Sequence, residues 1–370
     1  MNVGGTPYRT IWLGDDGRNV QIIDQTRLPH EFVTVKLRTL DDAVVAIKSM
    51  QVRGAPLIGV TAAYGMALSV TVDPSDSGLK SAAKKLLKSR PTAVNLRWAL
   101  EHMHGVLREL QENQRVEAAY ATAAKIADDD VASCRAIGIH GAKVFNDLDV
   151  GLNKADSALN ILTHCNAGWL ATVDYGTALA PIYMLHDSGV RIHVWVDETR
   201  PRNQGASLTA WELGQHGVPH TVIADNAGGH LMQHGQVDAC ITGSDRTTGS
   251  GDVCNKIGTY LKALAAHDNN IPFYVALPHS TIDWSISDGV RDIPIEERDS
   301  REVTHIAGLG DDGEVTTVQV TPLGSKVANA AFDVTPARLV TGIITERGIA
   351  DPNGAGLVAL YPEHAQELAK

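Results

Sequence analysis

The stretch LNILTHCNAG, residues 159–168, runs from an apolar strand pattern directly into a tip that carries an imidazole, a thiol and an amide. Four later segments have the same form. The five apolar runs lie near residues 159–163, 191–197, 220–224, 238–242 and 272–277. Their tips end at Cys165, Glu198, Asp225, Asp245 and His279. Helical patterns separate the runs, and this alternation predicts an α/β fold with a mainly parallel, Rossmann-like sheet covered by helices on both faces.

Parallel strands that are joined by helices carry their carboxyl ends at one edge, where such sheets bind ligands. We therefore expect Cys165 and Asp245 to share a pocket. Cys165 stands between a strand end and a predicted long helix, whose dipole and backbone N–H groups would favour a thiolate. Asp245, when shielded in a pocket, can stay protonated near neutral pH and donate a proton. Taken singly, such a cysteine is more often a small core residue, and such an aspartate more often a helix cap or a salt-bridge partner of Arg246.

The first 150 residues have a different pattern. Short β-rich pieces occupy residues 8–36. Helical patterns cover residues 41–50, a run that begins at 53–59 and ends at Ser69, and residues 78–88, 94–111 and 115–145. A polar, turn-rich piece follows at 146–156. These features predict a smaller, mostly helical α+β domain with a small sheet at 1–150, and a Rossmann-like catalytic domain at 151–370. Within the second domain, residues 303–321 predict a β excursion with an Asp-Asp-Gly turn.

Composition argues against several classes of protein. The net charge is −11 over 370 residues without a block of like charge, whereas a general nucleic-acid binder needs a basic surface. The start lacks the pattern of a secretory signal, and no apolar run is long enough to span a membrane. The four cysteines form no CxxC pair, so neither a structural zinc site nor a disulfide framework is expected. The sequence therefore predicts a cytoplasmic protein without a membrane or nucleic-acid partner.

Known cofactor motifs are missing from the sequence. Neither GxGxxG nor GxxxxGK[ST] occurs in a suitable context, so we expect neither NAD nor a nucleotide phosphate loop. His140, His193 and His234 lie on helix or strand patterns without ligand spacing, and no metal site is predicted.

Two short motifs suit an anionic ligand instead. Arg53, Gly54 and Ala55 offer a guanidinium beside a glycine that lets a ligand approach the backbone. Asn255 and Lys256 lie near a predicted helix start, which suits phosphate. Arg90 and Gln204 are further candidates. Gln204, in a polar loop after a buried strand, can hydrogen-bond a sugar hydroxyl or a phosphate, or can satisfy loop backbone.

Together these motifs resemble one family closely, the methylthioribose-1-phosphate isomerases, which are related to regulatory subunits of translation initiation factor 2B. The resemblance runs from about Tyr8 to about Ile349. It is carried by DQTRLP at 24–29, RGAPLIG at 53–59, RPTAVNL at 90–96, THCNAG at 163–168, DETRPRNQGA at 197–206, GSDR at 243–246, NKIGTY at 255–260 and FDVTPARLVTGIITERG at 332–348.

The resemblance implies an isomerase that converts an aldose 1-phosphate to the ketose 1-phosphate in methionine salvage, with Cys165 and Asp245 as its catalytic pair. It implies substrate binding by Arg53, Gly54, Ala55, Arg90, Gln204, Asn255 and Lys256. It also implies a smaller N-terminal domain before a Rossmann-like domain, a homodimer, and no metal or organic cofactor. Ser244, Cys254 and Trp169 depart from the family pattern, as does the loop 247–251, and these changes can adjust the group accepted at C5 of the sugar.

Chemistry is consistent with this pair. A sugar whose anomeric oxygen carries phosphate opens its ring only when the ring oxygen is protonated, which suits a neutral Asp245. Hydrogen then moves from C2 to C1 through an enediol or as a hydride, with Cys165 as a base in the first route or as a stabiliser of charge in the second. Alternatives remain open: 5-deoxyribose 1-phosphate or ribose 1,5-bisphosphate as the substrate, or a non-catalytic regulatory subunit of a translation factor.

Overall fold

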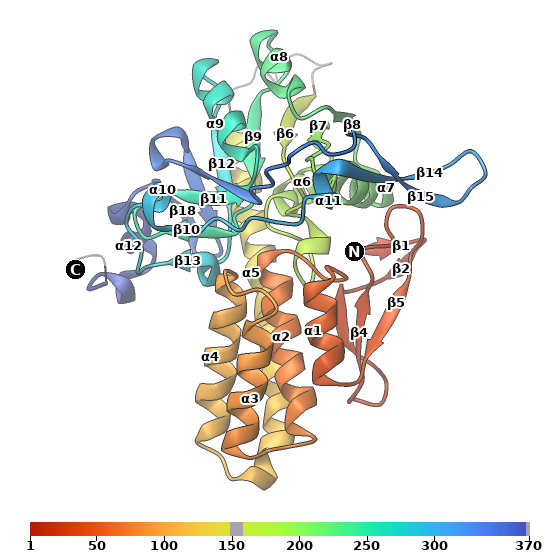
Figure 1. Cartoon of the computed structure of the whole chain (residues 1–370). Helices are drawn as coiled ribbons and strands as arrows, with labels where there is room; N and C mark the ends of the chain where they lie inside the picture. The colour runs from red at the N-terminus through yellow and green to blue at the C-terminus, as the bar shows by residue number, and fades with distance from the viewer. Residues whose placement is uncertain (149–157, 368–370) are drawn as a thin grey trace.

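The computed structural model describes residues 1–148 and 158–367. Its N-terminal part combines small sheets with a bundle of helices, and a larger sheet with its covering helices lies beyond one end of that bundle (Figure 1). The strands are β1 (Asn2–Val3), β2 (Thr6–Pro7), β3 (Ile11–Leu13), β4 (Val20–Ile23) and β5 (Thr34–Leu37). The helices are α1 (Leu40–Lys48), α2 (Ala55–Val70), α3 (Asp76–Leu87), α4 (Val94–Arg108) and α5 (Glu112–Asp147). The mostly helical first part with a small sheet is confirmed.

Local sequence explains the helices of the bundle. Thr39 and Asp42 form a reciprocal capping box that starts α1. Helix α2 is apolar on every side, and such a helix is stable only when other elements surround it. Helices α1, α3, α4 and α5 pack around it and bury almost its whole length. The long helix α5 also packs against α6 (Leu179–Asp187), so it joins the bundle to the sheet beyond.

The larger sheet has the strand order β18-β17-β12-β9-β6-β7-β8. The five predicted strands are confirmed as β6 (Leu159–Thr163), β7 (Ile192–Asp197), β8 (His220–Ile223), β9 (Ala239–Thr242) and β12 (Phe273–Ala276), and they pair in parallel. Two more strands, β17 (Gly342–Thr345) and the antiparallel β18 (Gly348–Ala350), extend one edge. From β6 the chain adds strands outward to β8, and from β9 it adds them in the other direction. The gap between β6 and β9 is therefore the point where the strand order reverses.

A second sheet lies beside the first one and was not foreseen from the sequence. It has the order β13-β10-β11-β16 and consists of β13 (Ile282–Asp283), β10 (Arg246–Thr248), β11 (Val253–Lys256) and β16 (Phe332–Thr335). Strand β11 places Asn255 and Lys256 on a strand, and the helix α9 (Thr259–Asp268) begins shortly after them. The predicted β excursion is confirmed as the hairpin β14 (His305–Leu309) and β15 (Val315–Gln319), which projects from the body of the molecule (Figure 1).

Short helices complete the described chain. They are α7 (Ala210–His216), α8 (Ala227–Gln233), α10 (Gly289–Asp292), α11 (Arg301–Thr304) and α12 (Gly354–Leu360). Single helical turns lie at η1 (Trp169–Ala171), η3 (His279–Thr281), η4 (Ala337–Leu339) and η5 (Pro362–His364), and the π-helical turn η2 (Gly205–Thr209) precedes α7.

The helix expected after Cys165 is wrong, and the domain junction expected at 146–156 lies mostly outside the described residues. The long helix predicted directly after Cys165 is absent, because the chain forms a loop with the single turn η1 before α6 begins at Leu179. The domain division near residue 150 stays a prediction, since most of the proposed junction at 146–156 falls on residues 149–157, outside the described residues.

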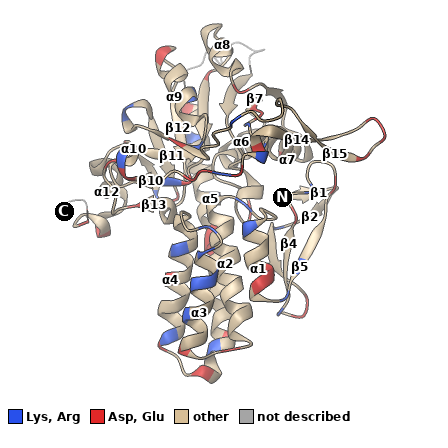
Figure 2. Cartoon of the chain, in the orientation of Figure 1, with Lys and Arg blue, Asp and Glu red and all other residues tan. Residues whose placement is uncertain are grey.

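Charge is spread over the described chain without a large region of one sign, as Figure 2 shows. Among the described residues, none of the helices is both long enough and apolar enough to cross a membrane.

Candidate active site

A cavity of about 60 Å³ lies at the carboxyl edge of the parallel sheet, next to the gap between β6 and β9. Its wall comes from both sides of residue 150. All nine residues predicted from the sequence line it: Arg53, Gly54, Ala55, Arg90, Cys165, Gln204, Asp245, Asn255 and Lys256. A wider cleft of about 680 Å³ adjoins it and shares Met50, Arg53 and Gln204 as wall residues.

Arg53 reaches the cavity from the segment just before α2. Its guanidinium donates to Asn166 twice, once to the side-chain Oδ1 and once to the backbone carbonyl at 2.5 Å. Burial lowers the pKa of Arg53, while the nearby Cys165 and Asp245 act in the opposite direction. No carboxylate pairs with Arg53 within 4 Å in the described part of the chain. A buried guanidinium held by an amide in this way keeps its charge available for an anion.

Gly54 allows the N-terminus of α2 and the loop after Cys165 to approach each other closely. Its backbone has φ 94° and ψ 136°, a region that is open essentially only to glycine. A Cβ on Gly54 would lie 2.4 Å from the carbonyl oxygen of Ala171. Gly54 therefore lets the N-terminus of α2 meet the loop that follows Cys165, and the free N–H groups of this helix end are suited to an anion.

Gly54→Ala is expected to disturb the cavity, because it adds a clash with backbone to a strained φ. We expect kcat/KM for the substrate to fall by about 100-fold or more, in line with the effect of small misplacements in a site. Gly17→Ala is the matched control, since Gly17 also has a positive φ (64°) but has nothing within 4 Å of its Cβ position. Equal activity losses in the two variants would contradict this explanation.

Cys165 lies in the left-handed region with φ 65°, which is unusual for a residue other than glycine. Its backbone N–H donates to Thr199 Oγ1 at 2.8 Å, and its carbonyl accepts from Thr209 Oγ1 at 2.7 Å. Burial raises the pKa of the Cys165 thiol, although Arg53 and Lys256 act to lower it. This direction is opposite to the sequence expectation, because the predicted helix is absent and the thiol is shielded from solvent.

Asp245 follows β9 and faces the same cavity. Its backbone N–H donates to the carbonyl of Cys254 at 3.0 Å, whereas its carboxyl oxygens accept no hydrogen bond from the described residues. Burial raises the pKa of Asp245, and Lys256, Arg90 and Arg53 oppose that rise. A carboxyl group that is half-buried and poorly solvated favours its neutral form, as a proton donor requires.

Lys256 is a second buried cation without a counter-ion. Only 7% of its surface is exposed, and within the described ranges no carboxylate oxygen lies within 4 Å of its ammonium group. The ammonium lies 5.0 Å from the centre of the Phe332 ring. Burial lowers the pKa of Lys256, and Cys165 and Asp245 raise it. Because buried charges are normally paired, Lys256 and Arg53 together indicate a site for an anion.

Two wall residues keep buried polar atoms without a partner among the described residues. These atoms are Arg90 Nε and Gln204 Oε1. Most buried polar groups are hydrogen-bonded, so an unpaired donor and acceptor in a cavity wall suit a polar ligand. The neighbouring Asn255 already donates to Thr259 Oγ1 at 3.0 Å and is held in place by it.

A row of alternating charges runs from the cavity to the adjoining cleft and was not foreseen from the sequence. Arg90 and Arg298 line the cavity, and Arg202 and Glu302 line the cleft. Arg90 pairs with Glu296 at 3.4 Å, and Arg298 pairs with Glu296 and with Glu302 at 2.8 Å each. Arg202 closes the row by pairing with Glu302 at 3.1 Å. Burial would raise the pKa of Glu302, but Arg298 and Arg202 together lower it to about 2. We call residues 296–302 the strap.

A buried network behind the cavity was also missed. Asn166 Nδ2 donates to Glu212 Oε1, and Tyr183 donates to Glu212 Oε2 at 3.0 Å. Glu212 is fully buried, and burial raises its pKa to about 7. Asn166 therefore links Arg53 at the cavity to a carboxyl group in the core. Asn166 is part of the motif at 163–168, but nothing in the sequence connects it to Glu212.

The raised pKa of Glu212 makes stability depend on pH. With an ordinary pKa of 4.5 and a folded pKa of about 7, its contribution is complete below pH 4.5 and is lost as the pH rises through 7. We expect Glu212→Gln, which cannot ionise, to gain about 2–3 kcal/mol in unfolding free energy relative to the natural chain between pH 5 and pH 8. Urea unfolding at several pH values measures this difference. The exposed Glu109→Gln serves as control, and parallel profiles for Glu212→Gln and the natural chain would contradict the assignment.

The other residues singled out from the sequence lie partly in the cavity wall and partly away from it. Of the three departures from the family pattern, only Ser244 lines the cavity. Trp169 is fully buried and stacks on Trp211, and Cys254 is buried on the strand β11. Asp225 accepts hydrogen bonds from two backbone N–H groups of the loop after β7, and His279 pairs with Glu346 at 3.3 Å.

Comparison with known proteins places the chain among proteins with closely similar sequences and folds. Residues 51–352 match the Initiation factor 2 subunit family. The chain is 68% identical over 363 residues to a protein of Methylorubrum extorquens named methylthioribose-1-phosphate isomerase, covering 98% of this chain and 99% of that protein.

Solved structures agree with this similarity. The 5-methylthioribose 1-phosphate isomerase of Pyrococcus horikoshii is 39% identical with a TM-score of 0.82, and the match covers 96% of each chain. A structure described as translation initiation factor eIF-2B, subunit delta, from A. fulgidus is 38% identical with a TM-score of 0.78, over 96% of this chain and 100% of that one.

Proposed function

The chain belongs to the initiation factor 2 subunit family, and from this premise we propose that it is the aldose–ketose isomerase that converts 5-methylthioribose 1-phosphate to 5-methylthioribulose 1-phosphate in methionine salvage. Its curated relatives at 61–68% identity carry the name methylthioribose-1-phosphate isomerase. The observation that carries the proposal is one cavity that holds a thiol, a carboxyl group with a raised pKa and two buried cations without counter-ions.

In this proposal the phosphate lies between Arg53 and Lys256. Both cations are buried, and the N-terminus of α2 at Gly54 and Ala55 adds backbone N–H groups on the same side. Arg90 Nε and Gln204 Oε1 remain to bind phosphate or sugar hydroxyl groups. Asn255 completes the set.

Asp245 acts as the general acid that opens the sugar ring. The proposed step moves the carboxyl proton to the ring oxygen while the bond from C1 to that oxygen breaks, so that C1 becomes a cationic carbon stabilised by the oxygen that still carries the phosphate. Loss of a proton from C2, or a hydride shift from C2 to C1, then neutralises this charge. The raised pKa of Asp245 supports this role, since the acid must reach the reaction in its protonated form.

Cys165 lies beside the same carbons in this arrangement. In the enediol route it removes a proton from C2, and in the hydride route its thiol stabilises the charge that develops as hydrogen moves from C2 to C1. Arg53 and Lys256 favour the thiolate, and burial favours the thiol. Turnover in D₂O separates the routes, because an enediol exchanges its hydrogen with solvent and a direct hydride transfer keeps it.

The residues of the cavity wall indicate which substituent at C5 of the sugar the site can accept. Met50, Ile58 and Phe332 give the cavity an apolar side that suits a methylthio or methyl group. The wall residue Arg298 is already paired with Glu296 and Glu302, so it offers no free charge to a second phosphate. This supports the methylthio sugar or 5-deoxyribose 1-phosphate over ribose 1,5-bisphosphate.

A purified sample tests the proposal. ³¹P and ¹³C NMR should detect ketose 1-phosphate formed from 5-methylthioribose 1-phosphate, with 5-deoxyribose 1-phosphate and ribose 1,5-bisphosphate assayed in parallel. Absence of turnover with all three would leave the second candidate, a non-catalytic subunit, which the likeness to the structure described as eIF-2B subunit delta favours.

We further propose a cytoplasmic homodimer that needs no metal or organic cofactor.

A further inference from the structure

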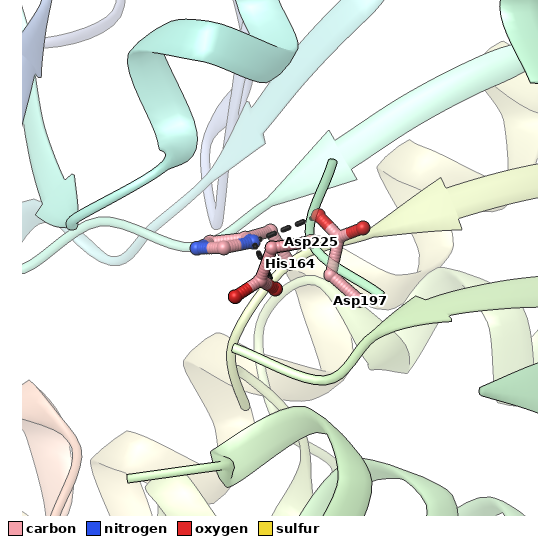
Figure 3. Close-up of side chains that lie close together, drawn as sticks. All are labelled: His164, Asp197 and Asp225. Carbon is pink, nitrogen blue, oxygen red and sulfur yellow. Dashed lines mark hydrogen bonds and ion pairs between the residues drawn. The ribbon is translucent and has the colours of Figure 1, made fainter. Parts of the chain in front are cut away.

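His164 directly precedes Cys165, and its side chain is fully buried outside the set of residues discussed so far as catalytic or binding. Its Nδ1 lies 2.8 Å from Asp197 Oδ2 and 4.0 Å from Asp225 Oδ1, as Figure 3 shows. On the opposite side of the ring, Nε2 lies 2.8 Å from the backbone carbonyl of Ile257. Both ring nitrogens therefore face oxygen atoms.

These partners determine where the ring protons lie. A carbonyl oxygen only accepts, so Nε2 must carry a proton. Asp197 Oδ2 also lies 3.1 Å from the ammonium of Lys262, which favours the ionised carboxylate. An ionised carboxylate accepts as well, so Nδ1 carries the second proton. The other charged groups near the ring are Asp225, whose Oδ1 lies 4.0 Å from Nδ1, and Asp333.

The same contacts connect the segments that carry the reacting groups. His164 directly follows β6 and precedes Cys165, Asp197 ends β7, and Ile257 directly follows Lys256. The ring also fits against Gly258, where a Cβ would lie 2.8 Å from His164 Cε1. The imidazole thus spans the distance between the thiol segment and the cation segment.

The backbone at this place needs such support. Cys165 and Thr199 both have φ 65°, and a β-branched residue in the left-handed region is a clear outlier. Thr199 Oγ1 accepts from the Cys165 N–H, and the N–H of Thr199 donates to Asp225 Oδ1 at 2.6 Å. Strained conformations of this kind persist only when surrounding contacts hold them.

We propose that His164 is a doubly protonated positioning residue, which through Asp197 and the Ile257 carbonyl fixes Cys165 and Lys256 relative to each other. The inference rests on the isomerase function proposed above and deepens it. His164 touches no substrate in this proposal. It holds the strained turn that aims the thiol and the ammonium into one cavity.

A metal ion is the competing explanation for the cluster. The imidazole and two carboxylates of His164, Asp197 and Asp225 offer ligand atoms within 4.8 Å of one another. The Lys262 ammonium already lies on Asp197 Oδ2, however, and donates to the Asp225 carbonyl as well. Two fixed cations therefore occupy the space around this carboxylate, and the proposal assigns the cluster to the imidazolium.

Ring-nitrogen NMR of the full chain labelled with ¹⁵N-histidine tests the protonation. At pH 8 an ordinary histidine is mostly neutral with one ring proton. We expect one residue to show protons on both ring nitrogens, and its signals to vanish in His164→Gln. A single ring proton on His164, or loss of ring protons on addition of Zn²⁺ with splitting typical of a ligand, overturns the proposal. This measurement needs no variant to be active.

Kinetics test the positioning. We expect His164→Gln to lower kcat about 10- to 100-fold, the usual effect of losing a group that orients an active residue. KM should rise less than kcat falls, since Lys256 is displaced but Arg53 and Gln204 remain to bind substrate. His140→Gln is the matched control, because His140 Nδ1 also contacts a backbone carbonyl, that of Thr345 at 2.9 Å, away from the cavity.

The outcomes separate the two claims. A natural chain without turnover overturns the isomerase function, whatever the ring spectrum shows. A natural chain with turnover and a His164→Gln variant with unchanged kcat overturns the positioning role alone. If His164→Gln does not fold, Asp197→Asn provides the second variant, and it should lower kcat and remove one of the two His164 ring protons. Retention of both protons and of full kcat in Asp197→Asn contradicts the proposal.

Discussion

Asp245→Asn is expected to lower kcat by about three orders of magnitude while the chain remains folded. General acids contribute roughly 10²- to 10⁴-fold, and an amide cannot deliver a proton to the ring oxygen of the sugar. The amide has nearly the shape of the carboxyl group, and the carboxyl oxygens of Asp245 accept no hydrogen bond from the described residues, so little folding energy should be lost. Initial rates by ³¹P NMR at saturating substrate, with circular dichroism for the fold, measure both effects.

The control for this variant lies on the same strand. Asp238 directly precedes β9 and accepts a hydrogen bond from the backbone N–H of Asn160 at 2.7 Å, at the end of the strand remote from the cavity. Asp238→Asn should keep kcat within about twofold of the natural value. A near-natural rate in Asp245→Asn would remove Asp245 from the mechanism and leave the anion site intact.

The pH dependence of kcat/KM also tests the role of Asp245 as the general acid. Burial raises the pKa of Asp245, and the reaction requires the protonated form, so kcat/KM should fall on the alkaline side as the carboxyl group ionises. This alkaline limb should be missing from the residual activity of Asp245→Asn.

Cys165→Ser is the second change with a large expected effect, again about 1,000-fold in kcat. A hydroxyl group is a much weaker acid than a thiol, so Arg53 and Lys256 cannot bring it toward the anion as they do the thiol. The shape is retained, so substrate should still bind with a similar dissociation constant, measured by calorimetry. Loss of binding together with rate would point to a disturbed turn at residue 165 instead.

Cys240 provides the matched control. It is likewise a free cysteine, buried on β9 of the same sheet, and burial raises its pKa far above the usual range. Cys240→Ser should lose some stability, because it buries a hydroxyl group, but should keep its kcat. Equal losses of kcat at positions 165 and 240 would show that the thiol of Cys165 has no special role.

The sequence predicted the elements whose patterns are local. Five strands followed from apolar runs that end in polar tips, and helices of the bundle followed from their spacing, with α2 recognisable by its unbroken apolar character. The strands β17 and β18 and the sheet that contains β11 were missed. Their pairing depends on partners far along the chain, such as β11 with β16, and local propensity does not reveal such pairs.

The candidate site divides in the same way. Every residue chosen from a motif lines the cavity, because a motif conserves the local geometry that brings its side chain there. The partners of those residues were not predictable. Nothing near Glu212 in the sequence indicates that Asn166 joins it to Arg53, and nothing near Glu296 indicates its pairing with Arg90. The long helix expected after Cys165 was wrong, because the chain forms a loop there, and burial raises the pKa of the thiol.

The double hydrogen bond from Arg53 to Asn166 has a consequence for how substrate enters. It joins the anion grip of the first part of the chain to the residue next to Cys165, and the contact of Gly54 with Ala171 tightens the same seam. This contact ties Arg53 to the segment that carries Cys165. Arg298 lines the cavity, and its ion-pair partner Glu302 lines the wider cleft together with Arg202. We expect dissolved salt to weaken these ion pairs and to change the rate of substrate entry from the cleft more than the chemical step behind it.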